Sequence, residues 1–281
     1  MYNIENIKNT ILQGDVLEQL KLIPDNSIDM CITSPPYWNL RDYGKEGQIG
    51  QENTFQEYIE KLINIYNEVY RVSKETATCW VNLGDTYSNK NNSGVKKQSL
   101  IGIPDRFKIA MIDNGWICRN EIIWHKPNAM PSSVKTRFNN DFEKMFFFTK
   151  NDKYYFEQQK EKSKDTYNGK RGSCKTRKKM QSAMRDTSDE VKIYKERNMR
   201  SVWSINTTSF KGSHFAVYPE ELIIHPIKAG SPDKGTVLDI FMGSGTTGIV
   251  AKKLNRNYIG IELNPDYVKM ANDRIIEETT N

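Results

Sequence analysis

The fold is decided by one stretch of the chain, Val237-Leu238-Asp239-Ile240-Phe241-Met242-Gly243-Ser244-Gly245-Thr246-Thr247-Gly248. Its first residues form an apolar run typical of a buried strand, the glycines predict a tight turn, and the residues up to about Leu254 predict a helix. A second predicted strand, 258–262, follows and ends in Glu262. Glycines in such a turn let a cofactor approach the backbone, and a helix N-terminus favours a carboxylate or a phosphate. The pattern predicts an α/β protein with a cofactor site, in which Glu262 bonds ribose hydroxyls.

This glycine pattern is shared by nicotinamide-dependent oxidoreductases, so it does not by itself identify the cofactor. Only 33 residues follow Gly248. They are too few for the rest of a dinucleotide-binding sheet unless the order of its strands is permuted.

A second stretch, Cys31-Ile32-Thr33-Ser34-Pro35-Pro36-Tyr37-Trp38, is where we expect the chemistry. Residues 28–33 are rich in apolar and β-branched side chains, as expected for a buried parallel strand. The two prolines end this strand because neither has an N–H to donate, and they fix φ at consecutive positions. Ser34 and Tyr37 then flank a stiff loop at the carboxyl end of the strand, where open α/β sheets bind ligands. Taken alone, the same residues also fit a proline turn with a tyrosine in the core.

The two stretches together resemble the amino-methyltransferases of DNA, in the permuted order often called the β class. The family's catalytic tetrapeptide has the form Asp/Asn/Ser-Pro-Pro-Tyr/Phe/Trp, and Ser34-Pro35-Pro36-Tyr37 matches it. The cofactor motif has the form Phe-x-Gly-x-Gly, which is matched by 241–245. The catalytic motif precedes the cofactor motif, as in that class, and the resemblance covers nearly the whole chain except about 151–200. Ile240 and Met242 replace the Pro and Ala that are common in the family, and they leave the glycine geometry intact.

The resemblance implies an α/β fold with the Rossmann-like sheet of S-adenosylmethionine-dependent methyltransferases, circularly permuted and carrying a basic target-recognition insert. It implies S-adenosyl-L-methionine as the cofactor and double-stranded DNA as the substrate. The implied catalytic residues are Ser34, Pro35, Pro36 and Tyr37, and the implied cofactor-binding residues are Asp15, Phe215, Asp239, Phe241, Gly243, Ser244, Gly245, Thr246 and Glu262. Asp15 also fits an N-cap for a helix over 16–22, and the two roles are compatible.

The reaction implied by the resemblance is methylation of an exocyclic amine, whose lone pair is delocalised into the base. Ser34 and the carbonyl of Pro35 would accept hydrogen bonds from its two N–H groups and free the lone pair for in-line attack on the methyl group. Tyr37 would stack on the base, which is flipped out of the duplex. In this family, Ser at the first tetrapeptide position usually accompanies N4 of cytosine, and N6 of adenine is the alternative. Methylation of carbon 5 uses a Pro-Cys nucleophile, and no cysteine in this sequence follows a proline.

Three parts are expected along the chain: a first catalytic part over 1–150, a target-recognition insert over 151–200, and a second catalytic part over 201–281. From Lys150 to Arg200 the sequence has sixteen Lys or Arg and eight Asp or Glu, an excess larger than the net charge of +6 of the whole chain. Tyrosines and Phe156 are interleaved with these charges. Such a segment suits the neutralisation of phosphates and contact with base edges. A solvated charged surface is the simpler interpretation, and the position of the segment within the family favours recognition.

Within the first part, local signals predict further elements between the two motifs. Thr54-Phe55-Gln56-Glu57 fits a capping box at the start of a helix. Residues 77–83 predict a strand that ends at Gly84.

The composition of the 281 residues bounds the remaining possibilities. A pI near 8.9 favours an acidic partner. The four cysteines form no Cys-x-x-Cys pair and the three histidines are not clustered, so we expect no metal site and no disulfide framework. The first ten residues do not form a signal peptide, and no apolar run approaches the ~20 residues of a membrane span. We expect a soluble cytoplasmic protein of a bacterial or phage-infected cell, associated with the nucleoid.

Partners other than DNA are less well defined by the sequence. A monomer or a homodimer is expected, and a cognate restriction endonuclease is a further partner to consider. A methyltransferase that acts on a protein amide or on RNA would share the cofactor motif and is the more distant alternative. The basic segment favours DNA over both.

Overall fold

The computed structural model describes residues 1–40, 47–89, 94–162, 196–208 and 218–280. The chain divides into two compact units. The larger unit comprises Met1–Glu157 together with Ser201–Asn281, and the smaller unit comprises Gln158–Arg200. In the described part of the smaller unit, the short strands β6 (Lys160–Lys162) and β7 (Glu196–Asn198) pair in antiparallel fashion.

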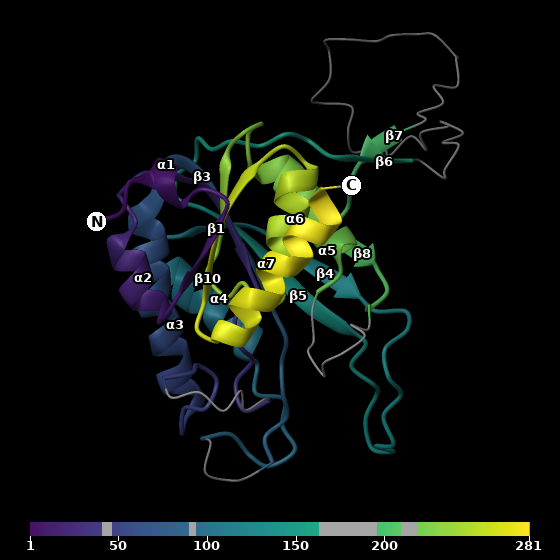
Figure 1. Cartoon of the computed structure of the whole chain (residues 1–281). Coiled ribbons are helices and arrows are strands. Elements are labelled where there is room, and N and C mark those ends of the chain that lie inside the picture. The colour runs from purple at the N-terminus through teal and green to yellow at the C-terminus, as the bar shows by residue number, and fades with distance from the viewer. Residues whose placement is uncertain (41–46, 90–93, 163–195, 209–217, 281) are drawn as a thin grey trace, which may run out of the picture. The chain divides into compact units, whose positions relative to one another are not determined.

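The larger unit has helices and strands in three layers. Figure 1 shows α2 and α3 on one side of the central sheet and α6 and α7 on the other. The helices are α1 (Ile4–Ile7), α2 (Val16–Leu22), α3 (Phe55–Val72), α4 (Ile103–Asp113), α5 (Glu220–Gly230), α6 (Thr246–Lys253) and α7 (Pro265–Thr279). The strands are β1 (Thr10–Gln13), β2 (Ile28–Thr33), β3 (Ser73–Leu83), β4 (Ile117–His125), β5 (Phe142–Thr149), β8 (Val202–Ser204), β9 (Thr236–Asp239) and β10 (Asn257–Glu262).

The strands form one eight-stranded sheet in the order β1-β10-β9-β2-β3-β5-β4-β8. Neighbours pair in parallel from β1 to β3, whereas β5 runs antiparallel to both β3 and β4. β2 lies directly beside β9, although 206 residues separate Thr33 from Asp239 at the ends of these strands. The strand before the glycine turn therefore enters the sheet next to the strand that carries the catalytic motif. The permuted, Rossmann-like α/β fold expected from the sequence is confirmed.

Burial on both faces explains the apolar composition of the central strands. Every residue of β9 is buried, and so is every residue of β2 except Asp29. β3 begins at Ser73, four residues before the strand predicted over 77–83, because Ser73 pairs with Ile28 of β2. Where such a strand begins depends on pairing with the neighbouring strand, so the local sequence does not predict it.

The segment 151–157 packs in the larger unit. The N–H of Tyr155 donates to the carbonyl of Thr76, and the Phe156 ring stacks on Phe147 of β5 with 5.7 Å between ring centroids. The division between units therefore lies at Gln158, seven residues after the start of the insert expected over 151–200. Phe156, which is 45% exposed, thus covers the buried Phe147 ring of the larger unit.

No helix within the described residues is long and apolar enough to cross a membrane. The described side chains also include no group of three or more His, Cys, Asp or Glu placed to hold a metal ion. Cys31 and Cys79 are buried free thiols and Cys118 is a half-buried one, whereas Cys174 lies outside the described residues.

The two halves of the permuted sheet are joined by the buried carboxylate of Asp239, which is 1% exposed. Its Oδ1 accepts hydrogen bonds from Thr33 Oγ1 at 2.6 Å and from the N–H of Phe241 at 3.1 Å. Its Oδ2 accepts from Tyr218 Oη at 3.0 Å and from Thr247 Oγ1. Burial raises the pKa of Asp239, and the hydrogen bonds from Thr247 and Thr33 act in the opposite direction. One side chain thus fixes β2, β9, the start of α6 and the segment before α5.

We expect Asp239→Ala to lower the free energy of unfolding, because it leaves buried donors without an acceptor. The loss should be about 1–3 kcal/mol for the unpaired groups alone. Asp239→Asn keeps the volume and one acceptor oxygen, so its loss should be smaller. Urea denaturation followed by circular dichroism measures both. Asp233→Ala, at an exposed carboxylate that bonds Asn255, is the matched control; equal losses for Asp239→Ala and this control would contradict the assignment.

Candidate active site

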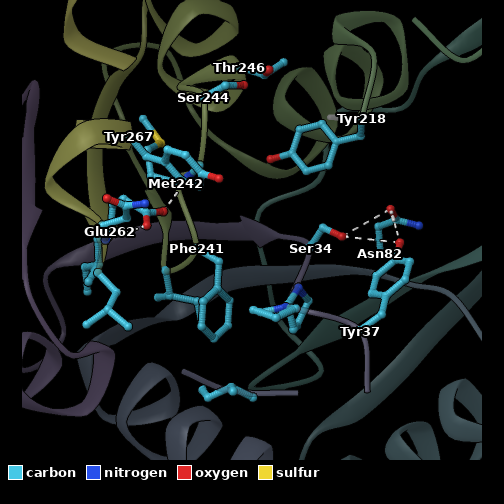
Figure 2. Close-up of a pocket in the computed structure, with 18 of the residues that line it drawn as sticks. Ser34, Tyr37, Asn82, Tyr218, Phe241, Met242, Ser244, Thr246, Glu262 and Tyr267 are labelled. Carbon is cyan, nitrogen blue, oxygen red and sulfur yellow. Dashed lines mark hydrogen bonds between the residues drawn. The ribbon is translucent and has the colours of Figure 1, made fainter. Parts of the chain in front are cut away.

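A cavity of about 450 Å³ opens at the carboxyl ends of the parallel strands. Its walls come from the residues that follow β1, β2 and β9 and from the ends of β3 and β10. This is where open α/β sheets bind their ligands. Figure 2 shows Ser34, Asn82 and Tyr37 together at one end of the cavity, Glu262 and Tyr267 at the other, and Phe241 between them.

The glycine turn after β9 has the backbone that its sequence predicts. Gly243 and Gly245 have φ angles of +52° and +86°, a region that glycine adopts without strain. A Cβ atom on Gly245 would lie 2.9 Å from Cβ of Ala271 in α7. Gly243 lines the cavity, whereas Gly245 serves the packing of α7 and is not among the lining residues.

Glu262 ends β10 and closes the glycine turn from the other side. Its Oε2 accepts from the N–H of Gly243 at 2.9 Å, and its Oε1 accepts from the N–H of Asn264 at 2.9 Å. Burial raises the pKa of this carboxyl, and the two backbone N–H groups act in the opposite direction. Each oxygen keeps a further lone pair for a hydroxyl donor in the cavity.

The start of α6 supplies hydroxyl groups to the cavity. The Oγ1 of Thr246 is buried and has no hydrogen-bond partner among the described residues. Ser244 Oγ accepts from Arg274 Nη1 at 2.9 Å. Because an unpaired buried hydroxyl is costly, Thr246 suits a polar ligand group placed at the positive end of the helix.

At the opposite end, Ser34, Tyr37 and Asn82 form a cluster of polar groups. Ser34 Oγ lies 3.4 Å from Tyr37 Oη and 3.5 Å from Asn82 Oδ1. Tyr37 Oη lies 3.2 Å from Asn82 Oδ1. Asn82 donates its amide to the carbonyl of Lys144 at 3.3 Å, which turns its oxygen toward the two hydroxyls. Figure 2 shows the contacts among Ser34, Tyr37 and Asn82 as dashed lines.

The ring of Tyr37 is held on two sides. Its hydroxyl donates to Glu143 Oε2 at 2.7 Å, and Glu143 is itself paired with Lys126. A Cβ atom on Gly84 would lie 2.5 Å from Cε2 of Tyr37, so only glycine fits beneath the ring. Burial, followed by the negative charge of Glu143, raises the pKa of Tyr37 well above its ordinary value. The tyrosine therefore stays neutral and fixed in the cavity wall.

The proline loop is fixed from behind by α3. Tyr58, which is fully buried, donates its hydroxyl to the carbonyl of Pro36 at 2.8 Å. Among the described residues, no hydrogen bond uses the carbonyl of Pro35. Pro35 and Pro36 both line the cavity, beside Ser34 in the sequence.

The structure brings most of the expected site residues together and separates a few. The expected residues that line the cavity are Asp15, Ser34, Pro35, Pro36, Tyr37, Phe241, Gly243, Ser244, Thr246 and Glu262. Asp15 also caps α2, because its Oδ1 accepts from the N–H groups of Leu17 and Glu18. Asp239 lies beneath the cavity and not in its wall, and Phe215 lies outside the described residues.

Asn82 and Glu143 lie in the cavity wall and were not predicted as site residues from the sequence. They come from the end of β3 and from the start of β5. Their positions follow from antiparallel pairing, in which Asn82 lies opposite Met145 and Trp124 opposite Glu143. No local motif encodes these contacts.

Comparison with known proteins gives the same assignment over most of the chain. The family model described as DNA methylase, N6_N4_Mtase, matches residues 28–273. The type II methyltransferase M.XycI of Xanthomonas campestris pv. cyanopsidis is 39% identical over 97% of this chain and 89% of its own length. M.Cfr9I of Citrobacter freundii, another type II methyltransferase, is 38% identical over the same shares of the two chains.

Solved structures show the same fold at lower identity. The PvuII DNA methyltransferase, described as cytosine-N4-specific, superposes with a TM-score of 0.67 at 21% identity, over 96% of this chain and 90% of that one. A putative DNA modification methylase from Thermus thermophilus, solved with S-adenosyl-L-methionine, gives a TM-score of 0.65 at 22% identity, over 96% and 95%. With the matched family model, and with relatives similar over almost their whole length, the chain belongs to the N6/N4 family of DNA methylases.

Proposed function

We propose that this DNA methyltransferase transfers the methyl group of S-adenosyl-L-methionine to the exocyclic N4 amine of a cytosine flipped out of duplex DNA. The observation that carries the proposal is the Ser34 hydroxyl, which lies in the wall of the same cavity as the glycine turn and Glu262. The two expected halves of the site therefore face one space, as a direct transfer of a methyl group requires.

The residues of the cavity fit the cofactor. Glu262 offers carboxylate oxygens to the ribose hydroxyls, and Asp15 lies at the expected adenine end of the cavity. The unpaired hydroxyl of Thr246, at the start of α6, suits the carboxylate of the methionine part. When bound, the cofactor supplies a methyl group on a positively charged sulfur.

The residues around Ser34 suit the activation of an amine. The amine needs two acceptors, and the Ser34 hydroxyl and the Pro35 carbonyl, which belong to consecutive residues that line the cavity, would supply them. Asn82 offers an acceptor to the Ser34 hydroxyl, which leaves the lone pairs of Ser34 for an N–H of the base. The Tyr37 ring, fixed by Glu143 and Gly84, offers a flat surface on which the flipped base can stack.

The choice of cytosine over adenine rests on Ser34 at the first position of the tetrapeptide, which in this family usually accompanies cytosine N4. Either base presents an amine to the same acceptors once it is flipped, so N6 of adenine is the second candidate. Transfer to an amide or amine outside DNA is a more distant candidate. The basic segment and the matched family favour DNA.

We further propose that the insert expected over 151–200 selects the DNA sequence and that the parts over 1–150 and 201–281 form the catalytic domain. The excess of eight basic residues between Lys150 and Arg200 supports phosphate contacts there. The names of the relatives, type II methyltransferases, support a cognate restriction endonuclease as the partner in the cell. The protein would then act in the cytoplasm, on DNA, as a monomer or homodimer.

The cofactor assignment predicts that Glu262→Ala weakens binding of S-adenosyl-L-methionine by about 1.5–3 kcal/mol, roughly ten- to a hundredfold. Because burial raises the pKa of Glu262, its carboxylate is lost at a higher pH than that of an exposed glutamate. Wild-type affinity should therefore fall as the pH decreases through that range, and this dependence should vanish in Glu262→Gln. Titration calorimetry measures both effects, with Glu60→Ala on the exposed side of α3 as control. Unchanged affinity in folded Glu262→Ala would remove the assignment.

The target base is tested by digesting DNA from cells that express the protein and identifying the modified nucleosides by mass. We expect N4-methylcytosine. Ser34→Ala should keep cofactor affinity and lose most methyl transfer, because one of the two acceptors for the amine is absent. Finding N6-methyladenine alone would contradict the choice of cytosine and leave the methyltransferase intact. Finding neither base would count against DNA as the substrate.

The insert contains the basic run Arg177-Lys178-Lys179. If the insert binds DNA, the triple variant with Gln at all three positions should bind the methylation site more weakly, and its affinity for the cofactor should be unchanged. The slope of log affinity against log salt should become shallower by about 0.9 for each phosphate that is no longer neutralised. Fluorescence anisotropy with a labelled duplex measures the slope. The control replaces Lys21, Lys252 and Lys269, which are exposed on helices of the larger unit, by Gln. Equal effects of the two triple variants would show that the insert has no special role.

A further inference from the structure

The connection between β4 and β5, residues 126–141, is the most exposed described segment near the cavity. All ten residues of 131–140 are exposed. Figure 1 shows the connection as a long teal excursion beyond the ends of β4 and β5. Two of its residues are large and apolar: Phe138 is 97% exposed and Met130 is 90% exposed. Single exposed apolar residues are common on proteins, so exposure alone does not assign a role.

The connection begins and ends in the wall of the cavity. Trp124 precedes it, Lys126 is its first residue, Glu143 follows it, and all three line the cavity. Inside the connection, the Asn128 side chain donates to the carbonyl of Thr207 at 3.0 Å and accepts from the N–H of Thr207 at 2.8 Å. Thr207 also lines the cavity. The exposed segment is therefore continuous with the rim through which a base would enter.

The exposed connection is held in place by contacts of its residues with Tyr87. The guanidinium of Arg137 lies 3.7 Å from the centroid of the Tyr87 ring, and the Tyr87 hydroxyl donates to Asn140 at 3.2 Å. The neighbours of Phe138 are thus fixed while its own ring stays in solvent. Holding an aromatic side chain almost fully in water forgoes the free energy of burial, which a bound partner could restore.

The charge of the connection indicates the kind of partner. Lys135 and Arg137 shortly precede Phe138 in the sequence, and neither has a carboxylate partner among the described residues. A phosphate backbone would supply the missing negative charge. An apolar side chain inserted between base steps is also the means by which DNA-bending proteins open the stack.

We propose that Phe138 is a wedge that enters the DNA duplex beside the target base and fills the space left when that base moves into the cavity. Lys135 and Arg137 hold the neighbouring phosphates. The inference rests on the proposed function, because a wedge at the rim is useful only if a base is flipped. Stacking on Tyr37 would offset the unstacking cost for the flipped base, and Phe138 would offset the cost for the bases that remain in the duplex.

The test compares two duplexes that carry the methylation site of the wild-type protein, one fully paired and one with a mismatch at the target base. Single-turnover methyl transfer by full-length Phe138→Ala should be slower by about tenfold or more on the paired duplex. On the mismatched duplex, whose base leaves the stack easily, the rate should return close to that of the wild type. Phe138→Trp should keep both rates, since it keeps a flat apolar side chain.

Controls separate the wedge from other roles. Ile276→Ala removes an apolar side chain that is 62% exposed on α7 and should change neither rate. Lys135→Gln should weaken binding of both duplexes equally and make the salt slope shallower by about 0.9, without changing the ratio of the two rates. Cofactor affinity, measured by calorimetry, should stay unchanged in every variant.

Several results would overturn the proposal. Wild-type rates for Phe138→Ala on both duplexes would remove the wedge, and so would equal losses on both duplexes. A change in sedimentation of Phe138→Ala without an effect on rate would assign Phe138 to contact between copies of the chain. If the wild-type protein methylates neither duplex, the proposed function fails instead, so the two failures are distinguishable.

Discussion

The structure depends on the hydrogen bond between Thr33 and Asp239, at 2.6 Å, in the interior of the sheet. β2 and β9 share only two register pairs, Met30 with Val237 and Cys31 with Leu238. The loops that follow these strands carry the catalytic and the cofactor motifs, so their relative position is set at the strand ends. Burying a carboxylate is costly, and the raised pKa of Asp239 reflects that cost. Hydroxyl and backbone donors from four segments offset it, which ties the fold to the site.

Each end of the cavity is fixed by hydrogen bonds and packing within the protein. Glu262 bridges the N–H groups of Gly243 and Asn264, so the cofactor turn is shaped by the same carboxylate that faces the cavity. The Tyr37 ring lies on Gly84 and is held by Glu143, which pairs with Lys126. Side chains fixed in this way do not need to be ordered when a ligand binds, which reduces the entropic cost of reaching a reactive geometry.

The apolar core and the excess of positive charge lie in different units of the chain. The apolar strands and the buried donors around Asp239 lie in the larger unit. The excess of basic residues lies mainly in the smaller unit, between Gln158 and Arg200. Charged residues in a segment with few apolar side chains can be replaced without destabilising the apolar core of the larger unit. If that segment selects the DNA sequence, as we propose, recognition can change while the site remains intact.

The amino-acid sequence was enough to predict the permuted α/β fold, the strands at 28–33 and 237–239, and the Thr54 and Asp15 caps. These features are local, because apolar runs, prolines, glycines and capping side chains act on their own neighbourhood. Tertiary structure alone placed Asp239 beneath the cavity, brought Asn82 and Glu143 to its wall, and divided the two compact units at Gln158. Those outcomes depend on which strands become neighbours and in what register, and pairing between distant segments leaves no pattern within either one.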